Sequence, residues 1–343
     1  MIRFDCDYTQ SAHPRILARL QETAAEQHAG YGMDDRCEKA RAYIKAACNA
    51  PHADVHFFVG GTQANATVIS AILRPHQGVI SPDTGHINTN ETGAVEGVGH
   101  KILTVPGQDG KLTAAQVAKV YDTHWADASH EHLAQPALVY ISHPTERGTV
   151  YTLAELEAIS AVCKEKGLPL FLDGARMGYG LAATGTDVTL EDLARLCDVF
   201  YIGGTKMGAL FGEAVVITND AFKQDFRYII KHHMGMLAKG FLLGIQFECL
   251  FEDGLYFELG RHAVKQAERL KQGILDAGLT LEYNTTASQL FPRVPDALAE
   301  KLREKFIFAH WAKPNDTHSV IRFCMSWATK PEDVDMLIEM LKD

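Results

Sequence analysis

A long hydrophobic run is absent from this 343-residue sequence, and its absence argues against a membrane protein. No segment approaches the roughly 20 apolar residues that cross a bilayer. The longest apolar candidate, residues 241–245, is short and lies between Lys239 and Glu248. The N-terminal residues carry charge where a secretory signal would be apolar. We therefore expect a cytoplasmic protein with no membrane partner.

Paired cysteines and an excess of positive charge are also missing. The seven cysteines are an odd number, and none forms a Cys-x-x-Cys pair, which argues against a zinc ribbon and a thioredoxin-type dithiol. Lys and Arg number 33 against 43 Asp and Glu, a net charge of −10, so we expect no nucleic-acid partner. Apolar residues make up 46% and charged residues 22%, as in ordinary globular proteins.

Short apolar runs that alternate with helical patterns occupy most of the chain. Thr152 with Glu155, and Thr113 with Gln116, are capping-box pairs that mark helix starts between the runs. Alternation of this kind predicts a three-layer αβα fold with a mostly parallel central sheet, which binds ligands at the carboxyl ends of its strands. The predicted strands span residues 55–59, 78–81, 101–105, 137–142, 168–172, 199–202 and 214–218.

The pattern changes after about residue 240. A long helical stretch over 242–274 is interrupted near Asp253-Gly254, and a closing helix begins at Pro331. Shorter strands are predicted between them, at residues 279–283, 289–294 and 319–324. We therefore predict a large domain over residues 1–245 and a smaller C-terminal α+β domain over residues 246–343.

A glycine-bearing turn, Gly60-Gly61-Thr62-Gln63-Ala64-Asn65, directly follows the first predicted strand and opens a helix. Backbone N–H groups and the helix dipole bind phosphate at such a turn, and the Thr62 hydroxyl adds a donor. The turn is neither a Walker loop nor Gly-x-Gly-x-x-Gly. Taken alone, it is explained equally well as an ordinary strand–helix connection.

An acid and a lysine end two later strands. Asp173 can be a metal ligand, a general base or the partner of a protonated ring nitrogen, and a structural ion pair with Arg176 is the alternative. No second acid or histidine lies within a few residues, so we predict no metal. Lys206 ends an apolar strand among glycines, where burial lowers the pKa of an amine as a Schiff base requires. A surface lysine in a loop is the alternative.

Together, a phosphate-binding turn, an acid and a lysine at strand ends indicate a pyridoxal-phosphate site. With the motifs 61–65, Asp173-Gly174-Ala175-Arg176 and Lys206, the sequence resembles the L-threonine aldolase family. This family lies within the β-eliminating-lyase group of pyridoxal-phosphate enzymes with the aspartate-aminotransferase fold (fold type I). The resemblance, from Asp7 to the last helix, implies a Lys206 Schiff base and cleavage of a β-hydroxy-α-amino acid of the L-threonine or L-allo-threonine type to glycine and an aldehyde.

The resemblance also implies roles for individual residues. His86 would stack on the cofactor ring and assist catalysis beside Lys206 and Asp173. Further cofactor contacts would come from Gly61, Thr62, Arg176 and Thr205, with Arg176 at the phenolic oxygen.

Substrate contacts are implied as well. Arg322, on a strand with apolar neighbours, would bind the α-carboxylate as a bidentate partner, or else be a solvated arginine on an edge strand. Asp7, Cys6 and Tyr31 would lie near the substrate, with sites at the interface of a homodimer or homotetramer.

Three departures from the family pattern bear on the site. Cys6 stands where the family often has serine. The family's Asn-Thr-His is replaced by Ser142-His143-Pro144-Thr145-Glu146, which leaves His143 or Glu146 as the substitute catalytic group. Where the family has an arginine that reaches a neighbouring subunit's phosphate, none is evident in residues 236–240, so either Lys239 takes over that charge or the contact is absent.

Two other functions remain open from the sequence. One is β-elimination from an aromatic or β-substituted amino acid, in which Lys206 removes the Cα proton. The other is a non-catalytic cofactor-binding or nucleotide-binding domain. His124, His130 and His132 lack regular helical spacing, so we expect a solvated loop and not a metal site, and we expect His232-His233 at a surface or interface.

Overall fold

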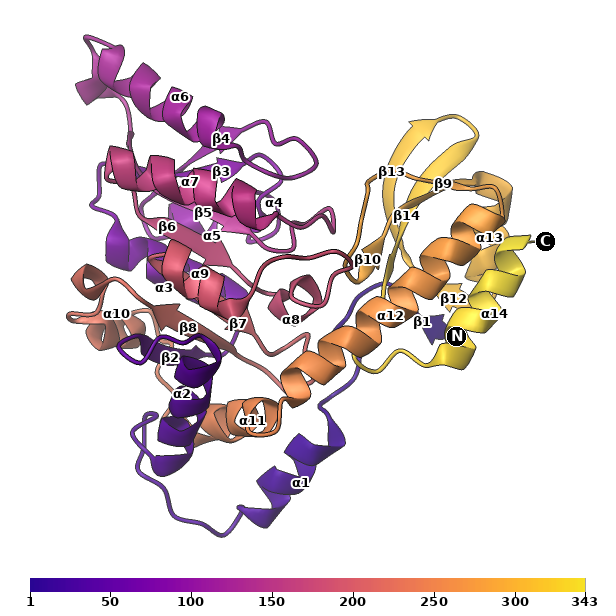
Figure 1. Cartoon of the computed structure of the whole chain (residues 1–343), viewed down its shortest axis with the longest axis horizontal. Coiled ribbons are helices and arrows are strands. Elements are labelled where there is room, and N and C mark those ends of the chain that lie inside the picture. Colours follow the sequence, from indigo (N-terminus) through magenta and orange to yellow (C-terminus); the bar gives the residue numbers. More distant parts are fainter. Residues whose placement is uncertain (343) are drawn as a thin grey trace.

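A computed structural model describes residues 1–342 of the chain. Figure 1 shows a large sheet-containing region and a smaller region, joined by the long helix α12 (Leu255–Asp276). The main sheet has seven strands in the order β2-β8-β7-β6-β5-β3-β4. These strands are β2 (Asp54–Phe58), β3 (Gln77–Pro82), β4 (Lys101–Val105), β5 (Gln135–Ser142), β6 (Leu170–Asp173), β7 (Val199–Gly203) and β8 (Glu213–Ile217).

The strands of the main sheet coincide with the seven predicted apolar runs. From β7 through β6, β5 and β3 to β4, all neighbours are parallel, and only β8 runs antiparallel to β2 and β7. The prediction of a mostly parallel sheet is therefore confirmed. Such strands are buried on both faces, and that is why they appear in the sequence as nearly continuous apolar runs.

Helices cover both faces of this sheet, as predicted (Figure 1). Phe171 of β6 faces the layer that contains α3, whereas Leu170 and Leu172 face the opposite layer. Because side chains alternate along a strand, Asp173 falls on the α3 face. The α3 layer consists of α3 (Gly61–Ile72), α4 (His86–Thr89), α5 (Ala94–Gly97) and α10 (Phe226–His232); opposite lie α2 (Asp35–Ala47), α6 (Ala114–Ala126), α7 (Leu153–Lys166), α8 (Met177–Gly180), α9 (Leu190–Leu196) and α11 (Phe241–Phe251).

The capping boxes are formed as predicted. The Thr152 side chain accepts the Glu155 N–H and the Glu155 side chain accepts the Thr152 N–H, and Thr113 and Gln116 repeat this arrangement. Both pairs satisfy N–H groups that a helix start leaves free, so α6 and α7 begin at fixed residues.

The C-terminal region agrees less closely with the sequence. The interrupted helix is confirmed as α11 and α12, separated at Gly254, whose φ is 73°. The predicted strand 289–294 is two strands, and β13 was not predicted because its mostly exposed residues lack an apolar run. After α12, the elements of the C-terminal region are β9 (Thr280–Leu281), β10 (Gln289–Leu290), β11 (Pro292–Pro295), α13 (Asp296–Arg303), β12 (Phe306–Ile307), β13 (Ala309–Asn315), β14 (His318–Cys324) and α14 (Pro331–Lys342).

The N-terminal segment connects the two regions. Its first strand, β1 (Ile2–Arg3), pairs with β12 in the smaller region, and α1 (Pro14–Glu22) then packs on α11. The predicted domain boundary, between residues 245 and 246, falls inside α11, and the division into domains stays a prediction.

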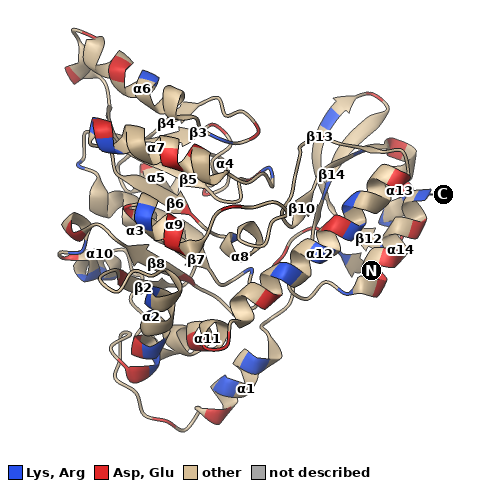
Figure 2. Ribbon diagram, viewed as in Figure 1, with Lys and Arg blue, Asp and Glu red and all other residues tan. Residues whose placement is uncertain are grey.

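Charge is distributed over the whole molecule. Figure 2 shows Lys and Arg interspersed with Asp and Glu along the outer helices. Across residues 1–342, no helix is both long and apolar enough to cross a membrane.

Candidate active site

The register of the main sheet brings three motifs to one edge. Phe58 at the end of β2 and Gly203 at the end of β7 both lie opposite Glu213, the first residue of β8. Gly61 begins α3 just after β2, and Lys206 follows β7. The phosphate-binding turn and the lysine are therefore neighbours across a single strand, as expected for a ligand site at strand ends.

Asp173, at the end of β6, is a buried carboxylate surrounded by hydrogen-bond donors. Tyr140 and Asn65 donate to Oδ2 at 2.7 and 3.0 Å, and Tyr201 and a backbone N–H donate to Oδ1 at 2.5 and 3.0 Å. Burial alone would raise the pKa of Asp173, but the charge of His86 and the tyrosine hydrogen bonds outweigh it and lower the pKa. Asp173 is therefore a fixed negative charge at neutral pH.

His86 lies between two buried carboxylates. Its Nδ1 is 2.8 Å from Glu91 Oε1, and its backbone N–H donates to Glu146 Oε1 at 3.0 Å. Asn65 Nδ2 donates to the same Glu91 oxygen at 2.7 Å. Burial lowers the pKa of His86, but the hydrogen bond with Glu91 and the charges of Asp173 and Glu91 outweigh it, so the pKa is raised.

The loop after β5 separates its two candidate catalytic groups. Glu146 accepts a hydrogen bond from Ser142 Oγ at 2.6 Å, and burial raises its pKa. His143 is fully buried, its Nδ1 accepts the Tyr151 N–H at 3.3 Å, and burial lowers its pKa to about 4. Of the two, the structure places Glu146 beside His86.

Lys206 is buried among charges of both signs. Burial lowers its pKa, and the neighbouring Arg176 lowers it further, whereas the carboxylates of Asp7, Asp173 and Glu213 act in the opposite direction. The net effect is a lowered pKa, which increases the share of neutral amine at a given pH.

Thr205, which precedes Lys206 in the chain, is hydrogen-bonded to Glu213. Thr205 Oγ1 donates to Glu213 Oε1 at 3.0 Å and accepts the Gly212 N–H at 3.0 Å. Burial raises the pKa of Glu213 to about 8. The Thr205 hydroxyl, expected at the cofactor, is thus engaged within the protein, and its role there stays a prediction.

Arg176 pairs with Asp7 from the N-terminal segment. Its Nε and Nη2 donate to the two Asp7 oxygens at 2.6 and 3.0 Å. The alternative in which Arg176 forms an ion pair with Asp173 is wrong, because the turn aims the guanidinium at Asp7 instead.

Arg322 enters from β14 of the smaller region. Its Nη2 donates to the Asp5 carbonyl at 2.9 Å, and its guanidinium carbon lies 5.5 Å from the centre of the Trp311 ring. Its Nε is buried and has no hydrogen-bond partner within the described chain. A partly unpaired, stacked guanidinium is suited to bind an anion.

The remaining predicted residues are less closely connected to this cluster. Cys6 is half-buried next to Asp7, and Thr62 is exposed in the first turn of α3. Tyr31 is 46% exposed, with its ring 4.8 Å from Lys231 Nζ, away from the contacts described above. Lys239 is exposed before α11.

Unpaired buried atoms test whether the site fits pyridoxal phosphate. Asn65 Oδ1, Glu91 Oε2, Glu146 Oε2 and Arg322 Nε have no hydrogen-bond partner in residues 1–342, although buried polar atoms almost always have one. The start of α3 adds free N–H groups for a phosphate. The amine of Lys206 fits an aldehyde, the fixed carboxylate of Asp173 fits a protonated ring nitrogen, and the helix start fits a phosphate.

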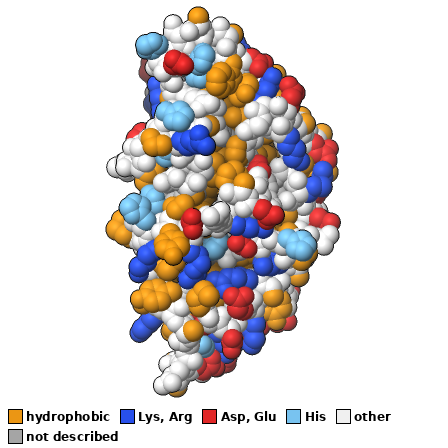
Figure 3. All heavy atoms as spheres, turned by 90° about the vertical axis from the view of Figure 1, so that its left-hand side faces the viewer, with side chains coloured by type: hydrophobic (Ala, Val, Ile, Leu, Met, Phe, Trp, Pro, Cys, Tyr) orange, Lys and Arg blue, Asp and Glu red, His pale blue; other side chains and the backbone are white. Residues whose placement is uncertain are grey.

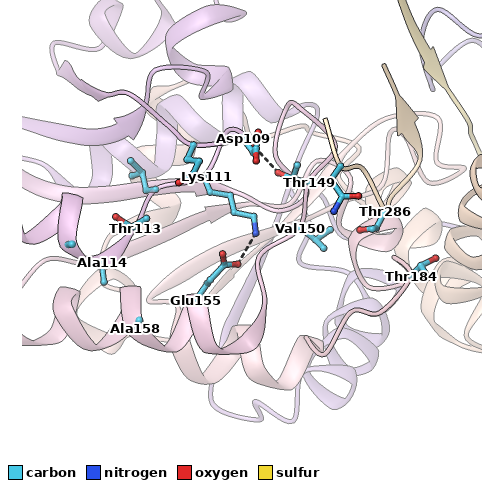
Figure 4. A pocket seen from close by; sticks show the side chains of 14 residues that line it. Asp109, Lys111, Thr113, Ala114, Thr149, Val150, Glu155, Ala158, Thr184 and Thr286 are labelled. Atoms are coloured by element: carbon cyan, nitrogen blue, oxygen red, sulfur yellow. Dashed lines mark hydrogen bonds and ion pairs between the residues drawn. The ribbon is translucent and has the colours of Figure 1, made fainter. Parts of the chain in front are cut away.

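Two sizeable cavities lie elsewhere. Figure 4 shows one of about 620 Å³ between the start of α7 and residues 284–286, crossed by the Lys111–Glu155 ion pair of 2.8 Å. Thr149 at its wall donates to the Asp109 carbonyl at 2.8 Å. Another, of about 650 Å³, is bordered by β4 and α6. Neither is lined by Lys206 or its neighbours, so size alone does not identify the site.

Sequence analysis did not identify several residues of the site. Glu91 belongs to no motif, and Tyr140 and Tyr201 appear only as apolar strand residues. The available signal was strand alternation, which places Tyr140, Tyr201 and Asp173 on one sheet face. Glu213 had the weaker signal of a charged residue beginning an apolar strand.

Of the three histidines predicted to lie in a solvated loop, His124, His130 and His132, one lies elsewhere. His124 is buried at the end of α6, where the rings of Trp125 and His130 lie 5.2 and 5.7 Å away, so its expected place in a solvated loop is wrong. In the part of the chain that the structure describes, no three histidine, cysteine or acidic side chains are grouped to hold a metal ion.

Comparisons with known proteins agree on one family. The model of the beta-eliminating lyase family matches residues 7–305. A low-specificity L-threonine aldolase from a Pseudomonas species is 32% identical over 307 residues, covering 88% of this chain and 87% of the relative. The structure of Leishmania major threonine aldolase superposes with a TM-score of 0.97 at 46% identity, covering 100% of this chain and 99% of the other. A Thermus thermophilus aspartate aminotransferase, at 15% identity and TM-score 0.73 over 100% and 91% of the chains, shares the fold.

Proposed function

The chain belongs to the beta-eliminating lyase family, and we propose that it cleaves the Cα–Cβ bond of a β-hydroxy-α-amino acid, releasing glycine and an aldehyde. It is a pyridoxal-phosphate-dependent lyase of the aspartate-aminotransferase fold. The substrate class is supported by the threonine aldolases that resemble it over most or all of their length. We infer L-threonine or L-allo-threonine as the substrate type.

The residues that would hold the cofactor are those at the strand ends. Lys206 would bind its aldehyde, because burial and Arg176 favour the neutral amine. The turn at Gly61 would bind the phosphate, and Asp173 would accept a hydrogen bond from the ring nitrogen. When bound, pyridoxal phosphate supplies the electron sink for the pair of electrons released from the Cα–Cβ bond.

Two side chains would position the substrate for bond cleavage. Arg322 has an unpaired Nε and would hold the α-carboxylate, which fixes the orientation of Cα. Glu146 has a buried, unpartnered Oε2 and a raised pKa, and would accept the proton of the β-hydroxyl group. His143 Nδ1 accepts the Tyr151 N–H, and we assign His143 no proton transfer in the reaction.

The observation that carries the proposal is that Asp173 and Lys206 follow neighbouring strands, with unpaired buried atoms of Asn65, Glu91 and Glu146 in the hydrogen-bonded cluster around Asp173 and His86. The test is incubation of the yellow holoenzyme with L-threonine and L-allo-threonine, with detection of glycine and acetaldehyde. Formation of both products supports the proposal. Ammonia and a keto acid would instead indicate β-elimination and overturn it. Borohydride should fix the cofactor to the parent protein but not to Lys206→Ala.

We also propose a homodimer or homotetramer in the cytoplasm. Exposed apolar side chains support the oligomer: Tyr228 is 77% exposed, Met234 84%, Met33 61% and Tyr31 46%. Figure 3 shows apolar side chains beside Lys and Arg over the face that is on the left in Figure 1, where α10 lies. Sedimentation equilibrium of the parent protein and of Tyr228→Ser tests this, since a monomeric parent would contradict the proposal.

A further inference from the structure

Among residues 1–342, Glu91 is the one carboxylate hydrogen-bonded to the His86 ring, and no sequence motif indicates it. It lies just beyond α4 and is 5% exposed as a residue, while its side chain is 0% exposed. A carboxylate so deeply buried is costly unless its oxygens accept hydrogen bonds. Oε1 accepts two, and Oε2 accepts none among the described residues.

The shared oxygen fixes the direction of these hydrogen bonds. The Asn65 amide nitrogen can only donate to Glu91 Oε1, at 2.7 Å. Glu91 Oε1 acts as an acceptor toward Asn65, and it can accept a second hydrogen bond from the His86 ring. The proton shared between Glu91 Oε1 and His86 Nδ1, which are 2.8 Å apart, therefore belongs on Nδ1. The other ring nitrogen, Nε2, then faces outward from the pair, and the imidazole keeps 36% of its surface exposed.

Asn65 also connects this pair to Asp173. Its Nδ2 also lies 3.0 Å from Asp173 Oδ2, so one amide group holds Glu91 and Asp173 together. Asn65 is on the first turns of α3, which the Gly61 turn begins. The position of the His86 ring is therefore set by the same helix that would bind the phosphate.

The charges that face His86 come from four elements. Glu91 follows α4, Asp173 ends β6, Glu146 follows β5, and Lys206 follows β7. Three are acids and one is a cation, and only Glu91 makes a direct hydrogen bond to the ring. A protonated ring is favoured by this set, and the raised pKa of His86 agrees with it.

We propose that Glu91 is a positioning residue that holds His86 as an Nδ1-protonated cation, so that Nε2–H acts as a hydrogen-bond donor in the site and His86 is not the base. The consequence for the reaction rests on the proposed function: the β-hydroxyl proton would pass to Glu146 and not to His86. No atom is oxidised or reduced in this step.

The experiment is an NMR titration of the histidine rings in the holoenzyme, with nitrogen-15 labels on both ring nitrogens. His86→Asn identifies the His86 signals. In the parent protein we expect Nδ1 to carry a proton throughout and the His86 midpoint to lie above that of a free histidine. Glu91→Gln should lower this midpoint by at least one pH unit, and Glu91→Asp should restore part of the shift.

Glu96→Gln is the matched control, because it removes the same charge from an exposed position nearby. Equal midpoints in Glu91→Gln and Glu96→Gln, or an unprotonated Nδ1 in the parent, would overturn the inference. If Glu91→Gln does not fold, the parent's Nδ1 signal and Glu91→Asp still decide. Absence of threonine cleavage would refute the proposed function but leave this ring titration valid, so the two failures are distinguishable.

Discussion

Asp7 and Arg176, 169 positions apart in the sequence, form a two-point ion pair inside the protein. The Asp7 side chain is fully buried and that of Arg176 is 13% exposed. Burial raises the pKa of Asp7, but the charges of Arg176 and Lys206 outweigh it and lower the pKa. The pair fastens the N-terminal segment over the strand ends, which is how a residue near the chain start reaches the site.

Breaking this pair from one side should cost much stability. Arg176→Leu leaves a buried carboxylate without its partner, and we expect the free energy of unfolding to fall by about 3–5 kcal/mol. Adding Asp7→Asn should recover part of that loss, because the unpaired charge is removed. Urea denaturation of the cofactor-free proteins measures both; a double variant as unstable as the sum of the singles would contradict the pairing.

Glu146 and His143 provide a direct comparison within one loop. Glu146→Gln should reduce kcat for β-hydroxy amino acid cleavage by roughly 10²–10⁴-fold, since it cannot accept the proton. His143→Asn retains an acceptor for the Tyr151 N–H and should keep kcat within a few-fold of the parent. Borohydride trapping confirms that each variant binds the cofactor. Comparable losses in both variants would argue against Glu146 as the proton acceptor.

Two adjacent glycines differ in what surrounds them. A Cβ at Gly61 would lie 2.9 Å from the Tyr201 hydroxyl, which donates to Asp173, whereas a Cβ at Gly60 would meet nothing within 4 Å. Gly60 has an extended backbone that alanine adopts without strain. Gly61→Ala should therefore raise the dissociation constant of pyridoxal phosphate at least tenfold, and Gly60→Ala should leave it nearly unchanged. Absorbance titration of the cofactor-free proteins checks this, and equal values would refute it.

Arg322 should be sensitive even to a change that keeps its charge. Lysine lacks the planar fork and does not stack on Trp311 in the same way, so Arg322→Lys should raise KM by roughly 10–100-fold, as expected for losing about 1.5–3 kcal/mol. Arg303→Lys is the control, because the Arg303 guanidinium carbon also stacks on an aromatic ring, 4.8 Å from the centre of the Phe308 ring, but its side chain is exposed and pairs with Glu300. An unchanged KM in Arg322→Lys would count against the carboxylate role.

The buried, neutral His143 should make the protein sensitive to acid. Its pKa is lowered from 6.5 to about 4, so between these values the unfolded chain binds a proton that the folded chain does not. Stability therefore rises with pH in this window, and His143 contributes a loss of about 2 kcal/mol between pH 6.5 and 5. His143→Asn cannot titrate, and urea denaturation at both pH values should show a smaller loss. An identical loss in parent and variant would exclude His143 as the cause.

Much of the fold was predictable because its strands are buried on both faces. Seven apolar runs became seven strands, and the Thr152 and Thr113 capping boxes fixed two helix starts. The smaller region was less predictable, since β13 is mostly exposed and β1 pairs with a strand near the other end of the chain. Exposed or two-residue strands leave little periodic signal.

The sequence by itself determined the chemistry available at the strand ends. The carboxyl ends of parallel strands lie at one edge of a sheet, so Gly61, Asp173 and Lys206, which follow β2, β6 and β7, could be identified without coordinates. Only the tertiary structure decided which neighbours act on them. Hydrogen bonds depend on side-chain direction, and that direction is set by packing between segments far apart in the chain. Thus Glu91 reaches the His86 ring, Glu146 accepts the His86 N–H whereas His143 accepts the Tyr151 N–H, and Asp7 pairs with Arg176.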